Sequence, residues 1–140
     1  MIGRLVIKMT EDDYKVFSAR MQERFPKMYG GNYGGFAVGP GWWKLIEHLS
    51  HVIQSHIDQA QQRGDDCPQV VVEQVKEKFG SLRFYYQGGD DFIHGATVLA
   101  ESLSGTLCEE CGGIGKRTRG GWVRTLCDFH IAENEAMKGK

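Results

Sequence analysis

The chain has 140 residues, a formal net charge of −1, a hydrophobic fraction of 41% and a charged fraction of 25%. These values fit one domain, or one domain with a small appendage, and exclude wholesale disorder, a fibrous repeat and a disulfide-dense scaffold. The small net charge provides no global basic field of the kind that favours nucleic-acid binding. The 19 glycines are about twice the usual share and cluster between Gly30 and Gly41 and between Gly112 and Gly121.

The N-terminus and the four cysteines favour a reducing compartment. The opening M-I-G-R-L-V-I-K-M is too short for the apolar core of a signal peptide, and no apolar run approaches the roughly 18 residues that cross a bilayer. We therefore expect a cytoplasmic protein without a membrane partner. In that compartment clustered cysteines more often bind a metal than each other.

Two helices are predicted in the first half of the chain. Thr10 is a good N-cap and forms an approximate capping box with Asp13, so a helix should begin at Glu11 and stop before Pro26. Its predicted buried stripe is Tyr14, Phe17, Met21 and Phe25. A second helix is predicted from Trp42 to about Gln62, with Gly64 at its C-cap.

The segment from Tyr29 to Gly41 mixes glycine with aromatic residues and has no period. One interpretation is a loop that packs its aromatic side chains on the core. The other is a binding loop, because glycine exposes backbone N–H groups to anions and aromatic rings offer stacking faces. The candidate ligand-binding residues here are Tyr29, Tyr33, Phe36, Trp42 and Trp43.

Residues 70–87 have the strongest strand pattern, with β-branched residues followed by aromatic ones. Gly80-Ser81 suits a two-residue type II′ turn, which pairs Phe79 with Leu82 and Val75 with Tyr86. One face of this hairpin is then mostly apolar. The other carries Lys76, Lys78, Arg83 and Tyr85, which form either a solvated surface or a second group of ligand-binding residues. An N-terminal strand at Leu5–Lys8 extends the predicted sheet.

A third helix is predicted from Asp90 or Asp91 to Gly105, with Phe92, Ala96, Leu99 and Leu103 as its buried stripe. Cys67 has no cysteine nearby, and we interpret it as an ordinary small thiol. His48 and His51 could offer two metal ligands, but a solvated helix face is the simpler interpretation.

The strongest chemical signal is near the C-terminus, where C-E-E-C is followed fifteen residues later by C-D-F-H. Pairs of ligands two residues apart allow one tight turn to present both to a tetrahedral ion. We predict that Cys108, Cys111, Cys127 and His130 bind one Zn²⁺. Four protein ligands leave no open position, so this zinc should be structural. Glycine turns, a strand at Trp122–Val123 and a helix from Asp128 to Met137 complete a treble-clef-like module.

The stretch between the two ligand pairs is basic and contains no acidic residue. The predicted basic patch is Lys116, Arg117, Arg119 and Arg124. The sequence thus predicts an α+β fold, with about three helices, a central antiparallel hairpin or small sheet, and the zinc module. An α+β body would span residues 1–107, with its Gly/aromatic loop at 29–43, and the zinc-binding module would be residues 108–140, docked on the body.

Several segments together resemble a known family: V-K-E-K-F-G-S-L-R-F-Y-Y (75–86), C-E-E-C-G-G-I-G (108–115), G-G-W-V-R-T-L-C-D-F-H (120–130) and F-A-V-G-P-G-W-W (36–43). The family consists of small uncharacterised proteins of bacteriophages and prophages, and the resemblance covers about residues 30–130. It implies a phage accessory protein made in the bacterial host cytoplasm. Such proteins commonly act in host takeover or against host defences.

We expect a binding protein without catalysis, because the sequence has no Walker motif, no nucleophile elbow and no H-E-x-x-H. A treble-clef nuclease is disfavoured because His130 is used for zinc and no second histidine stands nearby. The first expectation is sequestration of a nucleotide-derived immune signal of the host. The alternatives are a nucleic-acid-binding zinc module and an inhibitor that docks on a host protein. Homo-oligomers are a further possibility for any of these functions.

Overall fold

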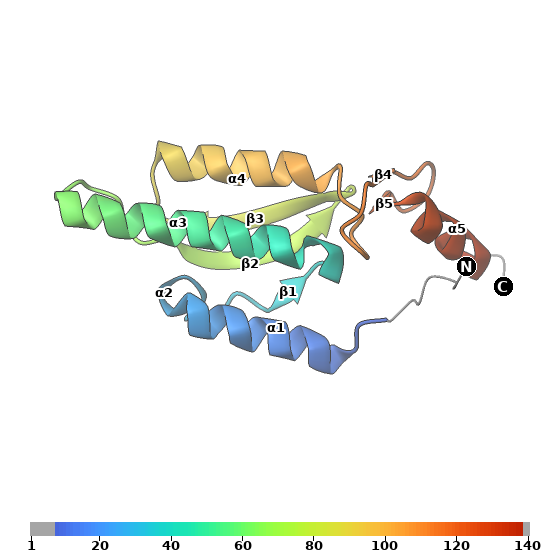
Figure 1. The fold of residues 1–140 in the computed structure, drawn as a ribbon, viewed down its shortest axis with the longest axis horizontal. Helices are drawn as coiled ribbons and strands as arrows, with labels where there is room; N and C mark the ends of the chain where they lie inside the picture. The colour runs from blue at the N-terminus through green and yellow to red at the C-terminus, as the bar shows by residue number, and fades with distance from the viewer. Residues whose placement is uncertain (1–7, 139–140) are drawn as a thin grey trace.

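The computed structural model describes residues 8–138, which form a mixed α+β fold (Figure 1). This confirms the predicted α+β class, although the described residues contain five α-helices where about three were predicted. The helices are α1 (Glu11–Arg24), α2 (Pro26–Tyr29), η1 (Pro40–Trp42), α3 (Trp43–Arg63), α4 (Asp91–Ser104) and α5 (Asp128–Lys138). The strands are β1 (Phe36–Ala37), β2 (Val71–Lys78), β3 (Ser81–Gln87), β4 (Lys116–Arg117) and β5 (Thr125–Leu126). The predicted strand at Leu5–Lys8 lies almost entirely outside the described residues.

The ends of α1 and α3 are set by the local signals that predicted them. Thr10 and Asp13 form a full capping box at the start of α1. The backbone N–H and the hydroxyl of Thr10 donate to the carboxylate of Asp13, and the backbone N–H of Asp13 donates to the hydroxyl of Thr10. Gly64 ends α3 in the left-handed conformation at φ 79°. Helix α1 stops before Pro26 as predicted, and Pro26 also begins the one-turn helix α2, which has no counterpart among the predicted helices.

The main sheet has the order β1-β2-β3, with β1 parallel to β2 and β2 antiparallel to β3. The hairpin turn is at Phe79-Gly80, and the predicted position at Gly80-Ser81 is wrong. Both turn residues adopt positive φ (54° and 81°), which is typical of a type I′ turn and not of the predicted type II′ turn. Lys78 therefore pairs with Ser81. This shift of two residues preserves which strand side chains share a face, so Val75, Leu82 and Phe84 are buried as predicted. Phe79, predicted on the same apolar face, lies in the turn and is exposed, and Tyr86 is half-buried.

Helix α4 packs along β3 and against α3, and it covers the open edge of β3 (Figure 1). The hydroxyl of Ser104 accepts from the backbone N–H of Leu82 at 2.8 Å, and the carboxylate of Glu101 accepts from that of Phe84 at 2.9 Å. These side chains complete the hydrogen bonds that an edge strand leaves open.

The same contacts overturn the predicted buried stripe of α4. Ile93, Thr97, Ala100 and Ser104 are buried, whereas Phe92, Leu99 and Leu103 are exposed and Ala96 is half-buried. The helix is rotated toward its polar side because the strand edge needs hydrogen-bond acceptors. With Val98, four large apolar side chains thus remain exposed on the surface of α4.

The core of the body is formed by α1, α2, α3, the inner face of the sheet and the side of α4 that carries Ile93 and Ala100. A second, small core of Cys108, Leu126, Cys127 and the half-buried Ile131 lies in the C-terminal segment. That segment contains the short β4–β5 ladder followed by α5 (Figure 1). The strand is Thr125–Leu126, and Trp122 and Val123, predicted as strand, lie in the loop before it. Among the described residues, no helix is long and apolar enough to cross a membrane.

Candidate metal centre and adjoining cleft

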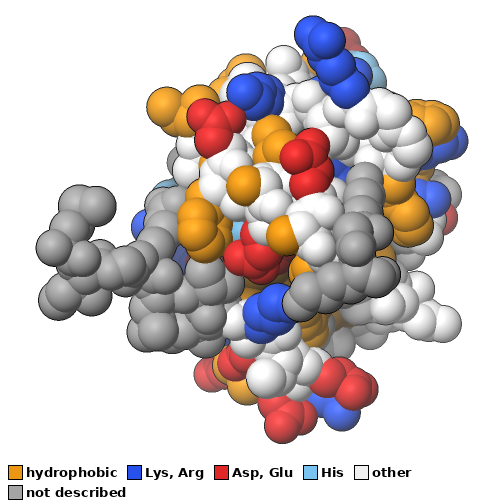
Figure 2. Space-filling model, turned by 90° about the vertical axis from the view of Figure 1, so that its right-hand side faces the viewer, with side chains coloured by type: hydrophobic (Ala, Val, Ile, Leu, Met, Phe, Trp, Pro, Cys, Tyr) orange, Lys and Arg blue, Asp and Glu red, His pale blue; other side chains and the backbone are white. Residues whose placement is uncertain are grey.

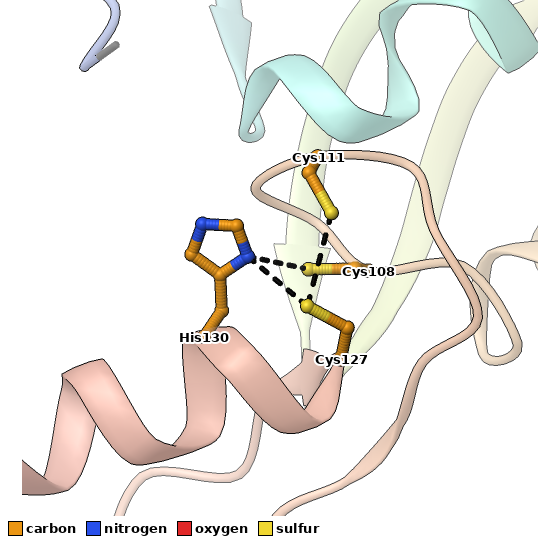
Figure 3. Close-up of side chains that lie close together, drawn as sticks. All are labelled: Cys108, Cys111, Cys127 and His130. Atoms are coloured by element: carbon orange, nitrogen blue, oxygen red, sulfur yellow. Dashed lines mark hydrogen bonds between the residues drawn. The ribbon is translucent and has the colours of Figure 1, made fainter. Parts of the chain in front are cut away.

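The four predicted metal ligands come together at the start of α5 (Figure 3). Cys108 and Cys111 lie on a tight knuckle, in which the N–H of Gly112 donates to the carbonyl of Cys108 at 2.8 Å and the N–H of Cys108 donates to that of Gly113 at 2.7 Å. Cys127 directly precedes α5, and His130 lies in its first turn. The sequence spacing predicted this grouping from two local turns.

The distances between the ligand atoms fit a tetrahedral metal ion. His130 Nδ1 is 3.5 Å from Cys108 Sγ and 3.2 Å from Cys127 Sγ, and the sulfurs of Cys111 and Cys127 are 3.8 Å apart. Bond lengths typical of zinc centres give edges of about 3.6 Å between nitrogen and sulfur and about 3.8 Å between sulfurs. These three distances lie within about 0.4 Å of the ideal edges, so the grouping is compatible with a bound metal ion.

The environment of the thiols differs within the group. Cys108 is fully buried, and this burial raises its pKa to about 11. Burial also raises the pKa of Cys127, but hydrogen bonds from the backbone and ring of His130 and from the other two cysteines outweigh it and lower the pKa to about 6. Metal binding requires deprotonated thiols, and the surroundings of Cys127 favour its thiolate.

The Gly-rich segment before α3 is the docking surface for the metal knuckle. The N–H of Gly41 donates to the carbonyl of Glu109 at 2.7 Å, and the N–H of Gly39 donates to its carboxylate at 2.9 Å. A side chain at Gly41 would collide with the carbonyl of Cys108 and lie 2.6 Å from the nitrogen of Gly112. Glycine is needed at these two positions because two backbone segments approach each other closely.

Three further contacts join the body to the C-terminal segment. The indole N–H of Trp42 donates to the carbonyl of Leu107 at 2.8 Å. The hydroxyl of Thr125 donates to the carbonyl of Gly80 in the hairpin turn. The indole N–H of Trp122 donates to the carboxylate of Glu77 at 3.3 Å.

A cleft of about 800 Å³ lies between the sheet and the C-terminal segment, and we call it the sheet–module cleft. Its walls come from α1, the β1 region, β2, the metal knuckle, the 118–124 loop and α5. The polar and aromatic lining residues are Tyr14, Gln74, Lys76, Glu77, Glu109, Glu110, Trp122, Arg124 and Asn134.

The charges in the sheet–module cleft are largely paired with each other. Arg124 bonds to Glu110 at 2.7 Å and lies 3.5 Å from the buried carboxylate of Glu109. Burial raises the pKa of Glu109, against the opposing effects of the Gly39 N–H and Arg124. Within residues 8–138, Lys76 makes no ion pair, so it is the free cation of the cleft.

The predicted ligand-binding residues do not form one site. Tyr29, Tyr33, Phe36 and Trp42 are buried in the core. Trp43 is half-buried and stacks on Phe17, with ring centroids 4.7 Å apart. These positions agree with the core-packing interpretation of the loop.

The sheet residues of the same prediction are divided between locations. Lys76 lines the sheet–module cleft, whereas Tyr85 borders a separate hollow beside Tyr33. Lys78 is exposed and lies over the ring of Phe79, and Arg83 is half-buried on β3. Only Lys76 of the predicted set therefore faces the sheet–module cleft among the described residues.

The predicted basic patch is smaller than its sequence suggests. Lys116 pairs with Asp128 at 2.9 Å, and Arg124 is directed at Glu109 and Glu110. Arg117 and Arg119 are exposed and remain as the patch. Figure 2 shows basic and acidic side chains interspersed on the end of the molecule that carries this segment.

Sequence reasoning missed most of the cleft. The sequence pattern places Tyr14 in the buried stripe of α1 and Trp122 in a strand, and it predicts no role for the two glutamates of C-E-E-C. The only signal that could have pointed to them is the run of two acidic residues between zinc ligands, opposite an arginine fifteen residues away. Comparisons of the chain with protein-family models, with curated proteins and with solved structures find no match.

Proposed function

We propose that this chain is a small binding protein, in which a structural Zn²⁺ fixes the C-terminal module against the sheet and the ligand occupies the sheet–module cleft. Three cysteines and a histidine in a tetrahedral arrangement suit zinc better than harder cations. Four protein ligands close the coordination shell, so the ion stabilises and does not catalyse. A zinc of this kind contributes on the order of 10 kcal/mol of folding free energy.

The observation that carries the binding function is the composition of the cleft. It combines two aromatic side chains, Tyr14 and Trp122, with the unpaired Lys76 and with amide groups at Gln74 and Asn134. Aromatic faces, hydrogen-bonding groups and one free cation suit a nucleobase with a single phosphate. Three carboxylates against two cations in the lining disfavour a polyphosphate, because they repel added negative charge.

The biological role that fits this chemistry is sequestration of a nucleotide-derived immune signal by a phage accessory protein in the cytoplasm of a bacterial host. The phage assignment rests on the sequence resemblance alone. The absence of catalysis in this proposal rests on the closed zinc shell and on the missing catalytic motifs. Capture of a nucleotide requires neither an open metal position nor a catalytic motif.

Isothermal titration of the full chain with adenosine and guanosine monophosphates and their cyclic mono- and dinucleotide forms tests the proposal. Lys76→Met should weaken binding of the nucleotide that responds by about tenfold or more, because a charge-assisted contact is lost. Lys78→Met is the matched control on the same strand, outside the cleft, and should bind as the wild type does. No heat with any nucleotide and an unchanged melting temperature would refute the function.

The two other functions remain predictions with one observation each. Arg117 and Arg119 are exposed and suit a phosphate backbone, although two paired cations of the basic patch lower its field. A salt-titrated assay with duplex and single-stranded DNA tests that function, and no binding at low salt would exclude it. For docking on a host protein, the supporting observation is the group of exposed apolar side chains on α4, which could form the contact surface.

A further inference from the structure

We propose a second metal site, independent of the Cys3His group, formed by His56 of α3, Cys67 of the loop before β2 and Asp90 at the start of α4. One donor atom from each of these residues lies within 4.8 Å of the other two. The three residues are distant in sequence and come from three different elements, so no local turn explains their meeting.

The donor set suits a divalent ion of the zinc type. An imidazole nitrogen, a thiol sulfur and a carboxylate oxygen are the three ligand types that zinc uses in proteins. Three protein ligands leave the fourth position of a tetrahedral ion for water, whereas the Cys3His group is closed. The side chains of His56 and Asp90 are 19% and 32% exposed, so water can reach that position.

Neighbouring contacts already orient two of the three ligands. The Oδ1 atom of Asp90 accepts from the N–H of Ile93 at 3.1 Å and caps α4, while Oδ2 lies 2.7 Å from Nε2 of His56. The ring of His56 stacks on Phe92, with centroids 4.2 Å apart and planes 15° apart. Supporting contacts of this kind fix the orientation of metal ligands.

The cluster does not have the arrangement of a nucleophilic thiol. Nε2 of His56 is directed at Asp90, and the thiol of Cys67 also forms a hydrogen bond with Asp90. The imidazole is therefore not placed as a general base that takes the proton of the thiol. Burial and the nearby carboxylates of Asp90 and Asp66 raise the pKa of Cys67. A bound cation would offset both effects by favouring the thiolate.

The geometric change that binding requires is small. Tetrahedral zinc separates a nitrogen and an oxygen ligand by about 3.3 Å, so the His56–Asp90 contact of 2.7 Å must open by about 0.6 Å. The Cys67 sulfur lies within 4.8 Å of the other two donor atoms and must come to about 3.6 Å from each, while Oδ1 of Asp90 keeps the helix cap.

Metal analysis of the full chain tests the site. Protein equilibrated with Zn²⁺ and freed of excess ion should hold two equivalents, one in each group. Cys67→Ser should lose one equivalent, because a hydroxyl keeps the hydrogen bond to Asp90 but is a poor zinc ligand. His51→Gln is the control, an exposed histidine on the same helix, and should keep both equivalents.

A second variant and a second measurement guard against misfolding. Asp90→Asn keeps a good helix cap but removes the anionic ligand, and it should lose the same single equivalent. In chelator it should still melt cooperatively, at a lower temperature than the wild type because the contact of the carboxylate with His56 is lost. Substitution with Co²⁺ should add a spectrum with one thiolate to that of the three-thiolate group, and Cys67→Ser should remove it. One equivalent in the wild type, or two in Cys67→Ser, would overturn the proposal.

Discussion

The side-chain carboxylate of Glu109 accepts a hydrogen bond from the backbone N–H of Gly39 at 2.9 Å, across 70 residues of sequence. The backbone carbonyl of Glu109 accepts from Gly41 at the same place. Because Glu109 directly follows Cys108, the segment before α3 is held by the same knuckle that carries two of the four candidate metal ligands. Order at the metal centre and the shape of the sheet–module cleft are therefore linked.

The first prediction concerns Gly41. Gly41→Ala should lower the free energy of unfolding by about 1–3 kcal/mol, because the added methyl group meets backbone atoms of Cys108 and Gly112 that cannot rotate away. Urea denaturation measures this change. Gly95→Ala is the control, since its new methyl group meets open space on α4 and should stabilise the protein by about 0.5–1 kcal/mol. Equal effects at the two glycines would contradict close packing at Gly41.

The second prediction concerns the metal. Removing the ion with a chelator, or substituting Cys111→Ser, should abolish the ordered structure of residues 106–138, because the small core there is too small to fold by itself. Backbone amide spectra by NMR should lose the dispersed signals of Leu126 and its neighbours while those of α3 persist. Restored metal should recover them in the wild type only. A chelated wild type with unchanged spectra and melting would exclude a structural ion.

The third prediction concerns pH and the start of α1. The backbone and side chain of Thr10 hydrogen-bond to Asp13 and lower the pKa of its carboxyl below 3.8. A lowered folded-state pKa means that the ionised carboxylate stabilises the fold above the unfolded value, and that this contribution disappears as pH falls through the folded-state pKa. The stability difference between the wild type and Asp13→Asn should therefore shrink from pH 6 to pH 3.

Thermal melting of both proteins across that range provides the measurement. Acid also releases a bound metal ion, but this affects both proteins equally and therefore cancels in the stability difference between the wild type and Asp13→Asn. A difference that stays constant or grows toward low pH would show that the Asp13 carboxylate is not the titrating contact.

The fourth prediction tests the orientation of α4. Leu99→Gln should change the free energy of unfolding by less than about 0.5 kcal/mol, because Leu99 is 61% exposed. Ile93→Ala should cost about 2–5 kcal/mol, because Ile93 is fully buried. Chemical denaturation of the two variants compares them directly. If Leu99→Gln lowered the free energy of unfolding more than Ile93→Ala, Leu99 would belong to the buried side of α4, as the apolar pattern predicted.

Local sequence signals determined much of this protein. Thr10 and Asp13 begin α1, Gly64 ends α3, and the spacing of the cysteine and histidine pairs brings four metal ligands together. Each of these features depends on residues within one or two turns of each other, and short-range geometry is what a sequence records most directly. The alternation of residues 71–87 determined the hairpin faces for the same reason.

The tertiary structure decided the features that depend on distant contacts. Strand β1 has two residues and exists because Phe36 and Ala37 meet Val75 and Lys76. The exposed side of α4 depends on the hydrogen bonds that the edge of β3 needs, which the apolar pattern of the helix does not record.

The glycines near the start of α3 and the residue Cys67 show the same limit. Positions 39 and 41 require glycine because the metal knuckle packs closely on them. Cys67 has His56 and Asp90 as neighbours only when α3, the loop before β2 and α4 come together. Chain connectivity alone does not specify such pairings, since they are selected by the packing of whole elements. The sequence therefore determined the metal ligands and the helix ends, and the fold decided what surrounds them.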